Sequence, residues 1–465
     1  MLLHDIETGD VVEIGPREWV LLAGADGTRD VEGLRLAASR EGVLVDGGSL
    51  DALLEGVRDA GLLEEGPLPR RARGDQPADA ATAPDAGPST AVAREARPIE
   101  RLPGYAFTCD GHGSCCKLYA TVVFSPLEAA RARALRPEVL DGGDRHEHVF
   151  MPERGAGPCP GSAVALVDGR CAYLDGHLCS LHRAGGAGSK PIGCNLFPLS
   201  LVDDGARVRA SVSVECACVL ASVGKEGGDP ILPEAVRVRG DLDPAVVVDE
   251  LPPEVEVVPG ARAPLADYLA WSDAALAALP SSEDAAIAAW SLAAALSERG
   301  LDAARARAAA LEPARIDLDL AGQYVAALAG KAARRAKAQN AWRSERDLCR
   351  RGVSIVTAAA TLLADVDVLA AVAAGAGAAP SDEAFYLRVA LFGHQVVGYP
   401  LVTGLRDRAV AMWIARVFPL AASALYPGEE EPAFARPLAL VEALLRGHGL
   451  RRYTEELAAS AATTE

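Results

Sequence analysis

The chain has 465 residues, which is too long for a single hydrophobic core and predicts several domains. It carries 46 basic and 64 acidic residues, a net charge of −18, which argues against nucleic-acid binding and against an anionic membrane surface. The longest apolar run, residues 355–379, contains Asp365 and Asp367 and therefore predicts a buried helix rather than a membrane span. The first residues lack the basic and apolar regions of a signal peptide, so we expect a cytoplasmic protein.

Residues 1–65 contain 5 basic and 15 acidic residues, and we expect them to form a separate acidic domain. A short strand is predicted near Val11, followed by helices with apolar residues at helical spacing. The sequence motifs Asp-Gly-Thr-Arg at 26–29 and Asp-Ala-Gly-Leu-Leu at 59–63 give this segment a resemblance to the small winged-helix domains of the PqqD-like type. The resemblance implies a domain that binds a substrate peptide, usually by adding it as a strand at a sheet edge. A helical accessory domain without a ligand is an equally good interpretation.

Residues 66–98 hold six prolines and almost no large apolar side chains, which predicts a disordered linker. The cysteines follow it. Nine of the chain's ten cysteines fall between Cys109 and Cys218, and Cys349 is the remaining one. In a reducing compartment such a group is more often a metal site than a disulfide framework. We therefore expect residues 99–225 to form a metal-binding domain of short hairpins and loops.

The first cysteine motif places potential metal ligands at steps of three, three and one, at Cys109, His112, Cys115 and Cys116. Two intervening residues let a chain curl around one metal and present two side chains to it, as in zinc fingers and iron–sulfur loops. The remaining predicted ligands follow at Cys159, Cys171, Cys179, Cys194 and Cys216.

Local patterns predict how some of these residues are placed. Asp-Gly pairs at 168–169, 175–176 and 204–205 are typical of tight hairpins, and the second of them should bring Cys171 and Cys179 together. Alternating apolar residues from Val208 predict a strand that continues to Cys216 and Cys218, with both cysteines on one face. Either of these two could be the ligand, and Cys218 could be a spare thiol.

The ordered array is similar to the YkgJ-like cysteine cluster family, a zinc- or iron-chelating domain. His112 stands where that family's second cysteine belongs, and Lys190 stands in place of an arginine. The matching positions are Cys109, Cys115, Cys116, Cys171, Leu174, Cys179, Pro191, Cys194, Phe197 and Pro198. The resemblance implies metal ligation and covers about a quarter of the chain. The His112 replacement suits both zinc and iron.

One branch of that family, the flagellin lysine methylases, adds a later cysteine and a long helical C-terminal region. Cys216 and the Ala-rich helical pattern from residue 260 look like that layout. The resemblance implies an iron–sulfur cluster, S-adenosylmethionine and a protein or peptide lysine as substrate. The alternative is a non-catalytic, zinc-stapled interaction module, and a third possibility is metal storage or delivery. The sequence identifies no catalytic acid or base.

The expected fold class is α+β. A winged-helix-like domain (1–65) and linker (66–98) precede the cysteine-cluster domain (99–225), and a connecting segment (226–259) leads to an all-α helical bundle (260–465). One helix of the bundle should open near Ser281 and end at Gly300, with Ile287, Trp290 and Ala294 on one face.

Overall fold

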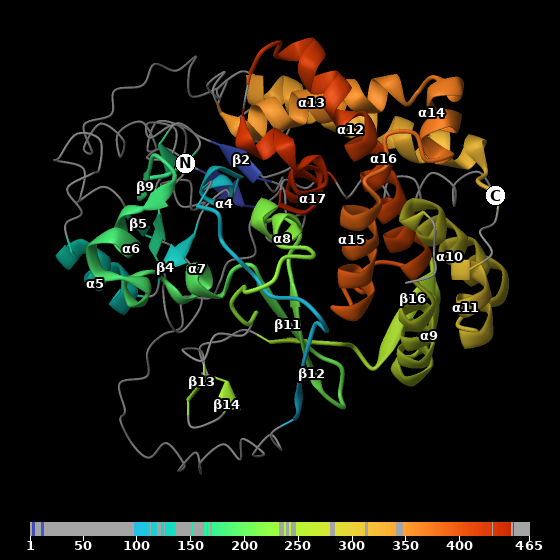
Figure 1. The fold of residues 1–465 in the computed structure, drawn as a ribbon, viewed down its shortest axis with the longest axis horizontal. Coiled ribbons are helices and arrows are strands. Elements are labelled where there is room, and N and C mark those ends of the chain that lie inside the picture. The colour runs from blue at the N-terminus through green and yellow to red at the C-terminus, as the bar shows by residue number, and fades with distance from the viewer. Residues whose placement is uncertain are drawn as a thin grey trace, which may run out of the picture. The chain divides into compact units, whose positions relative to one another are not determined.

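The structure is a computed structural model in which the chain forms two compact units, Met1–Ala96 and Arg97–Glu465 (Figure 1). It describes residues 2–4, 11–13, 97–111, 113–118, 122–124, 126–135, 150–152, 162–164, 166–167, 170–231, 237–238, 241–242, 248–279, 284–311, 315–340, 347–429, 431–447 and 450. In the first unit this leaves one antiparallel pair, β1 (Leu2–His4) with β2 (Val11–Glu13). The predicted winged helix and linker otherwise lie outside the described residues.

The described part of the second unit is mixed α/β with a C-terminal helical bundle, as the sequence predicts. Its strands are β3 (Ile99–Arg101), β4 (Val123–Phe124), β5 (Phe150–Pro152), β6 (Ser162–Val164), β7 (Leu166–Val167), β8 (Arg170–Cys171), β9 (Leu174–Asp175), β10 (Leu178–Cys179), β11 (Leu199–Asp203), β12 (Val208–Val212), β13 (Arg237–Val238), β14 (Asp241–Leu242), β15 (Asp249–Glu250), β16 (Glu254–Val258) and β17 (Ala261–Pro264).

The helices before the bundle are short, and those within it are longer. They are α4 (Ser114–Leu118), α5 (Pro126–Leu135), α6 (Ser180–Gly185), α7 (Ile192–Leu196), α8 (Ala217–Ala221), α9 (Leu265–Ala278), α10 (Ala285–Arg299), α11 (Ala303–Leu311), α12 (Leu318–Asn340), α13 (Leu348–Leu362), α14 (Val366–Ala373), α15 (Pro380–Phe392), α16 (Leu401–Leu425) and α17 (Pro437–Gly447), with 3-10 turns at Ala187–Ser189 and Pro432–Ala435.

The largest described sheet has four strands in the order β15-β11-β12-β3. Strands β11 and β12 form a hairpin around the predicted turn at Asp204 and Gly205. Gly205 has φ +91°, and Asp204 Oδ1 accepts from the N–H groups of Ala206 and Arg207, each at 2.9 Å. Strand β3 pairs parallel to β12, and β15 pairs parallel to β11. The sheet therefore ties residues that precede the cysteines to residues that follow them.

Smaller strand pairs carry cysteines. Strands β7 and β8 pair antiparallel across residues 168–169, and β9 pairs with β10 across residues 176–177. The β9–β10 turn follows Asp175 and contains Gly176 of the predicted Asp-Gly pair, because this turn chemistry is local. The Asp168-Gly169 pair lies outside the described residues. These hairpins and helices α5, α6 and α7 lie on the same side in Figure 1.

The helical bundle packs around α16, which contacts α10, α13 and α17. Helix α10 begins after Asp284, whose Oδ1 accepts from the N–H groups of Ala286 and Ile287 at 2.9 and 3.0 Å, and it ends at the predicted Gly300. Helix α16 is also long and apolar enough to cross a membrane by length and composition alone. The interior of the protein buries 67 % of its most apolar window, as expected for the core helix of a bundle.

Two separate hydrophobic clusters stabilise the second unit. The large one joins the four-stranded sheet, α8 and the bundle, and it includes Cys216 and Cys218. The small one contains six buried residues around Phe124 and Tyr173, with Cys171 and Cys179 packed against it. Among the described residues, the hairpins that carry Cys171 and Cys179 thus pack against a cluster separate from that of the bundle.

Candidate metal centre

Five cysteines from four elements line one cavity of about 340 Å³. They are Cys115 and Cys116 in α4, Cys171 in β8, Cys179 in β10 and Cys194 in α7. All five are partly buried free thiols. The structure thus brings together more than half of the nine predicted ligands.

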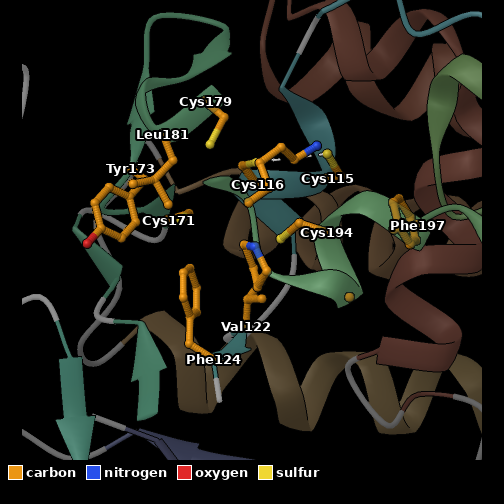
Figure 2. Close-up of a pocket in the computed structure, with 13 residues that line it drawn as sticks. Cys115, Cys116, Val122, Phe124, Cys171, Tyr173, Cys179, Leu181, Cys194 and Phe197 are labelled. Atoms are coloured by element: carbon orange, nitrogen blue, oxygen red, sulfur yellow. Dashed lines mark hydrogen bonds between the residues drawn. The ribbon is translucent and has the colours of Figure 1, made fainter. Parts of the chain in front are cut away.

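Figure 2 shows how these residues surround the cavity. Cys171 and Cys179 lie on one side, together with Tyr173 and Leu181, and Cys115, Cys116 and Cys194 lie across from them. Val122 and Phe124 close a further side. Among the described lining residues Lys190 is the only charged one, and the others are thiols, apolar groups and the phenol of Tyr173. The sequence analysis did not assign Val122, Phe124, Tyr173 or Leu181 to the site, and no local pattern marks them as its lining.

Helix α4 reaches the cavity through a tight approach of the chain at Gly113. This residue has φ +67°, and a Cβ there would lie 3.0 Å from Leu174 Cδ1 and 3.1 Å from the His177 carbonyl oxygen. Gly113 O accepts from Cys116 N at 3.0 Å, which starts the helical turn. A glycine is therefore required for α4 to lie against the β9–β10 hairpin.

The hairpin that carries Cys179 is fixed to the strand region that carries Cys171. Leu174 pairs with Cys179 across β9 and β10, as the turn at Asp175 predicts. Tyr173 O then accepts from both the backbone N and the Oγ of Ser180, at 2.8 and 3.0 Å. These bonds hold both cysteines at one side of the cavity.

Helix α7 carries Cys194 and is anchored to α5. Glu128 Oε1 accepts from Ile192 N at 2.7 Å, so a carboxylate from α5 satisfies a free N–H group at the start of α7. Lys190 immediately precedes this helix and also lines the cavity. Its positive charge favours the thiolate forms of Cys115 and Cys194.

Burial and hydrogen bonding hold most of these thiols in the protonated form. Burial raises the pKa of Cys171 and of Cys194 to about 12. Cys115 and Cys116 lie with their Sγ atoms 3.9 Å apart, and the hydrogen bond between them lowers the pKa of Cys115 and, together with burial, raises that of Cys116. Metal binding must therefore displace protons, because thiolates are the ligands.

Three further cysteines of the region do not line this cavity. Cys109 is exposed, whereas Cys216 and Cys218 are buried around the start of α8. The predicted strand through Cys216 and Cys218 is wrong, because β12 ends at Val212 and the chain turns into a helix. His112 and Cys159, both predicted ligands, lie outside the described residues.

Within the described ranges, no three His, Cys, Asp or Glu side chains are already arranged as a set that could hold one metal ion. Two of the cavity thiols, those of Cys115 and Cys116, instead form a hydrogen bond with each other. The donor set still fits a metal centre, because thiolates are the preferred ligands of zinc and of iron–sulfur clusters and five of them face one space.

A second cavity, of about 550 Å³, lies between the four-stranded sheet, α9 and α15. Its wall combines apolar side chains, such as Phe385 and Phe392, with charged ones of both signs. The charged residues are Glu100, Arg209, Asp273 and Arg388. The guanidinium of Arg209 donates to Asp273, whereas Arg388 forms no ion pair within the described residues and donates to the Pro103 carbonyl oxygen.

No protein-family model, curated protein or solved structure matches this chain.

Proposed function

We propose that the chain is a cytoplasmic metalloprotein of the YkgJ-like type that binds an iron–sulfur cluster in the 340 Å³ cavity. One observation carries the proposal: five cysteines from α4, β8, β10 and α7 line the same cavity. These elements are up to 79 residues apart in the sequence, counted from Cys115 to Cys194, so local chain geometry alone does not place their thiols together.

The size and composition of the cavity favour a cluster over a closed zinc site. A structural zinc ion takes four ligands at about 2.3 Å and leaves no open space between them. Here five thiols surround about 340 Å³, and the other described lining residues are mostly apolar, with Lys190 the only charged one among them. An apolar shell limits access of water and tunes the reduction potential of a cluster. When bound, the cluster would supply one-electron chemistry.

We further propose that the protein modifies a peptide or protein side chain, as the layout resembling flagellin lysine methylases implies. The second cavity supports an organic cosubstrate such as S-adenosylmethionine, because Arg388 suits its carboxylate and Phe385 and Phe392 suit its base. The N-terminal segment is proposed to bind the peptide substrate. The alternative function is a zinc-stapled interaction module with no catalytic activity.

Metal analysis and a visible spectrum of the full chain purified without oxygen test this proposal. We expect iron, acid-labile sulfide and absorption at about 400 nm. Cys171→Ser and Cys194→Ser should each lower the iron content at least several-fold, because each removes a ligand from the cavity. Cys349→Ala is the matched control, since Cys349 is a buried thiol in α13 outside this region and its loss should leave iron unchanged.

A colourless protein that contains zinc but no iron would refute the cluster and support the zinc-stapled module. If iron is present, incubation with S-adenosylmethionine and lysine-containing peptides separates the enzyme from an electron-transfer or storage protein. Consumption of S-adenosylmethionine that Arg388→Gln abolishes would support the proposed role of the second cavity.

A further inference from the structure

Lys190 places a positive charge at the 340 Å³ cavity, and no other described lining residue is charged. The residue follows the 3-10 turn at Ala187–Ser189 and comes directly before α7. It is half-buried, so its ammonium group is only partly shielded from the cavity by water. The sequence analysis noted Lys190 as a replacement for an arginine and gave it no role.

The backbone at Lys190 is fixed by its neighbours in α7. Pro191 is the N-cap of this helix, and a proline restricts the residue before it to extended conformations. Asn195 Nδ2 donates to the Lys190 carbonyl oxygen at 3.3 Å, and Asn195 N donates to Pro191 O at 3.1 Å. The side chain of Lys190 therefore starts from a fixed point beside the helix that carries Cys194.

The charge of Lys190 is not neutralised by an ion pair within the described part of the chain. Lys117, which directly follows Cys116, differs in this respect, because its Nζ pairs with Glu431 Oε1 at 3.3 Å. The carboxylate of Glu128 accepts from the backbone at the start of α7 and does not belong to the described lining. Lys190 is thus the cation that acts most directly on the cavity.

The effect of this charge is visible at two of the cavity thiols. Burial is the largest influence on the pKa of Cys194 and raises it. Among the charged groups Lys190 has the largest effect on this pKa and lowers it, whereas Glu128 raises it. Lys190 also lowers the pKa of Cys115 in α4. A group that stabilises negative charge on these sulfurs also stabilises negative charge on a cluster bound to them.

We propose that Lys190 raises the reduction potential of the iron–sulfur cluster by stabilising its reduced form. This inference rests on the proposed function, because it needs the cluster in the cavity. Reduction adds one electron and one negative charge, and the electron comes from the external reductant. No bond forms or breaks, and Lys190 keeps its proton. Because the other described lining residues are mostly apolar, the added charge attracts the ammonium group more strongly than it would in water.

The test is a redox titration with dithionite of the full chain purified without oxygen, followed by the absorption at about 400 nm. Lys190→Met removes the charge and keeps the length of the side chain. At a fixed solution potential it should lower the ratio of reduced to oxidised cluster about tenfold, a shift of about 59 mV to lower potential for one electron. Lys190→Gln should give a similar shift, which separates loss of charge from gain of an apolar side chain. Lys190→Arg should restore the potential.

Lys225→Met is the matched control, because it changes the net charge by the same amount at an exposed residue that does not belong to the described lining. It should leave the potential unchanged. Added salt should not abolish the shift caused by Lys190→Met, because partly buried charges are screened less than exposed ones.

The possible failures are distinguishable. An unmodified protein without iron overturns the proposed cluster, and this inference with it. A cluster that has the same potential in the unmodified protein and in Lys190→Met overturns the role of Lys190 alone, as does an equal shift in Lys225→Met. If neither neutral variant binds iron while Lys190→Arg does, the lysine is needed for cluster assembly, and the proposed effect on the potential is rejected.

Discussion

His394 is a buried histidine at 3 % exposure whose neighbours impose opposing effects on its charge. Its Nδ1 lies 3.1 Å from the Tyr268 hydroxyl, and its Nε2 lies 3.9 Å from Asp204 Oδ2. Burial lowers the pKa of His394. The carboxylates of Asp204 and Asp273 raise this pKa and the guanidinium of Arg209 lowers it, and the net effect is a decrease. The folded protein therefore holds this imidazole neutral at a pH where the unfolded chain begins to protonate it.

This arrangement predicts that the protein loses stability in mild acid. The unfolded chain binds more protons once the pH falls below the ordinary histidine pKa of about 6.5, so the free energy of unfolding should decrease from there toward the lower pKa of the folded state. The contribution of His394 is at most about 1.4 kcal/mol per pH unit. His394→Asn should flatten this slope between about pH 7 and 5. Asparagine is chosen because position 394 has φ +52°, a conformation that asparagine tolerates.

Denaturant unfolding at a series of pH values measures the effect. His182→Asn is the matched control, because His182 is exposed and its loss should leave the slope unchanged. Equal slopes for His394→Asn and the unmodified protein would show that His394 does not carry the acid sensitivity.

Gly113 offers a second prediction at the scale of one residue. Gly113→Ala combines the cost of a positive φ, about 1–2 kcal/mol, with contacts of 3.0 and 3.1 Å to the β9–β10 hairpin. Gly104→Ala is the matched control, because Gly104 has φ +65° and nothing lies within 4 Å of a Cβ there. Both variants should lose stability, but only Gly113→Ala should also lower the metal content. Equal metal loss in both variants would contradict the role of this close approach in positioning α4.

At the scale of elements, one buried arginine joins four helices of the bundle. Arg416 in α16 donates to Glu383 of α15 at 2.6 and 2.9 Å and to Asp284, the N-cap of α10, at 2.8 Å. Its remaining nitrogen donates to the Val372 carbonyl oxygen of α14 at 2.6 Å. Because the side chain is 1 % exposed, these partners replace most of the hydrogen bonds to water that it loses on burial.

We expect Arg416→Met to lower the free energy of unfolding by about 3–5 kcal/mol, since it leaves the buried Glu383 and the partly buried Asp284 without their cation. Arg436→Met is the control, because Arg436 pairs with Asp382 at 3.2 Å but is 39 % exposed, and its loss should cost about 0–1 kcal/mol. Chemical denaturation of both variants measures these two losses of stability. Similar losses for the two would mean that the buried network contributes little.

The secondary-structure elements also show how much of the fold could be predicted from the sequence. Hairpins at the Asp-Gly pairs and the end of α10 at Gly300 were predictable, because turn and capping chemistry acts within a few residues. The predicted strand failed after Val212, where Ser213 Oγ donates to Glu215 Oε1 at 3.0 Å and the chain turns, although the apolar alternation continues to Val214. Alternating apolar residues indicate that side chains are buried, but they do not show where a strand ends. Residues on both sides of this turn are buried, so the pattern continues past the end of β12.

The division of the cysteines could not be predicted for a different reason. Spacing predicted that they are metal ligands, but it gave no indication that Cys115 would line the cavity while Cys218 would donate to Asp110. That outcome depends on long-range packing, such as the bonds from Thr108 to Ser222 and from Glu128 to the start of α7. Patterns within one segment carry no information about such contacts.

At the scale of the whole described unit, the two hydrophobic clusters differ greatly in size. The small cluster around Phe124 and Tyr173 contains six buried residues and packs against Cys171 and Cys179. The large cluster contains the central helices of the bundle, including α10 and α16. The described part of this region consists of short helices and two- or three-residue strands that carry the cavity cysteines, so we expect a bound metal group to contribute to their stability.

Removing metal should therefore unfold one part of this unit and leave the other part folded. After chelation we expect amide hydrogen exchange to accelerate strongly in residues 162–182, which contain β6 to β10, while α10 and α16 keep their protection. Circular dichroism should then lose little helical signal, because most of the helical residues lie in the bundle. Adding the metal back without oxygen should restore protection in the hairpins, which separates reversible metal-coupled folding from damage to the protein.

Cys171→Ser, treated in the same way, should show fast exchange in these hairpins even before chelation. Loss of protection at equal rates in the hairpins and in α16 would mean that the two clusters unfold as one, and that the metal group stabilises the entire unit.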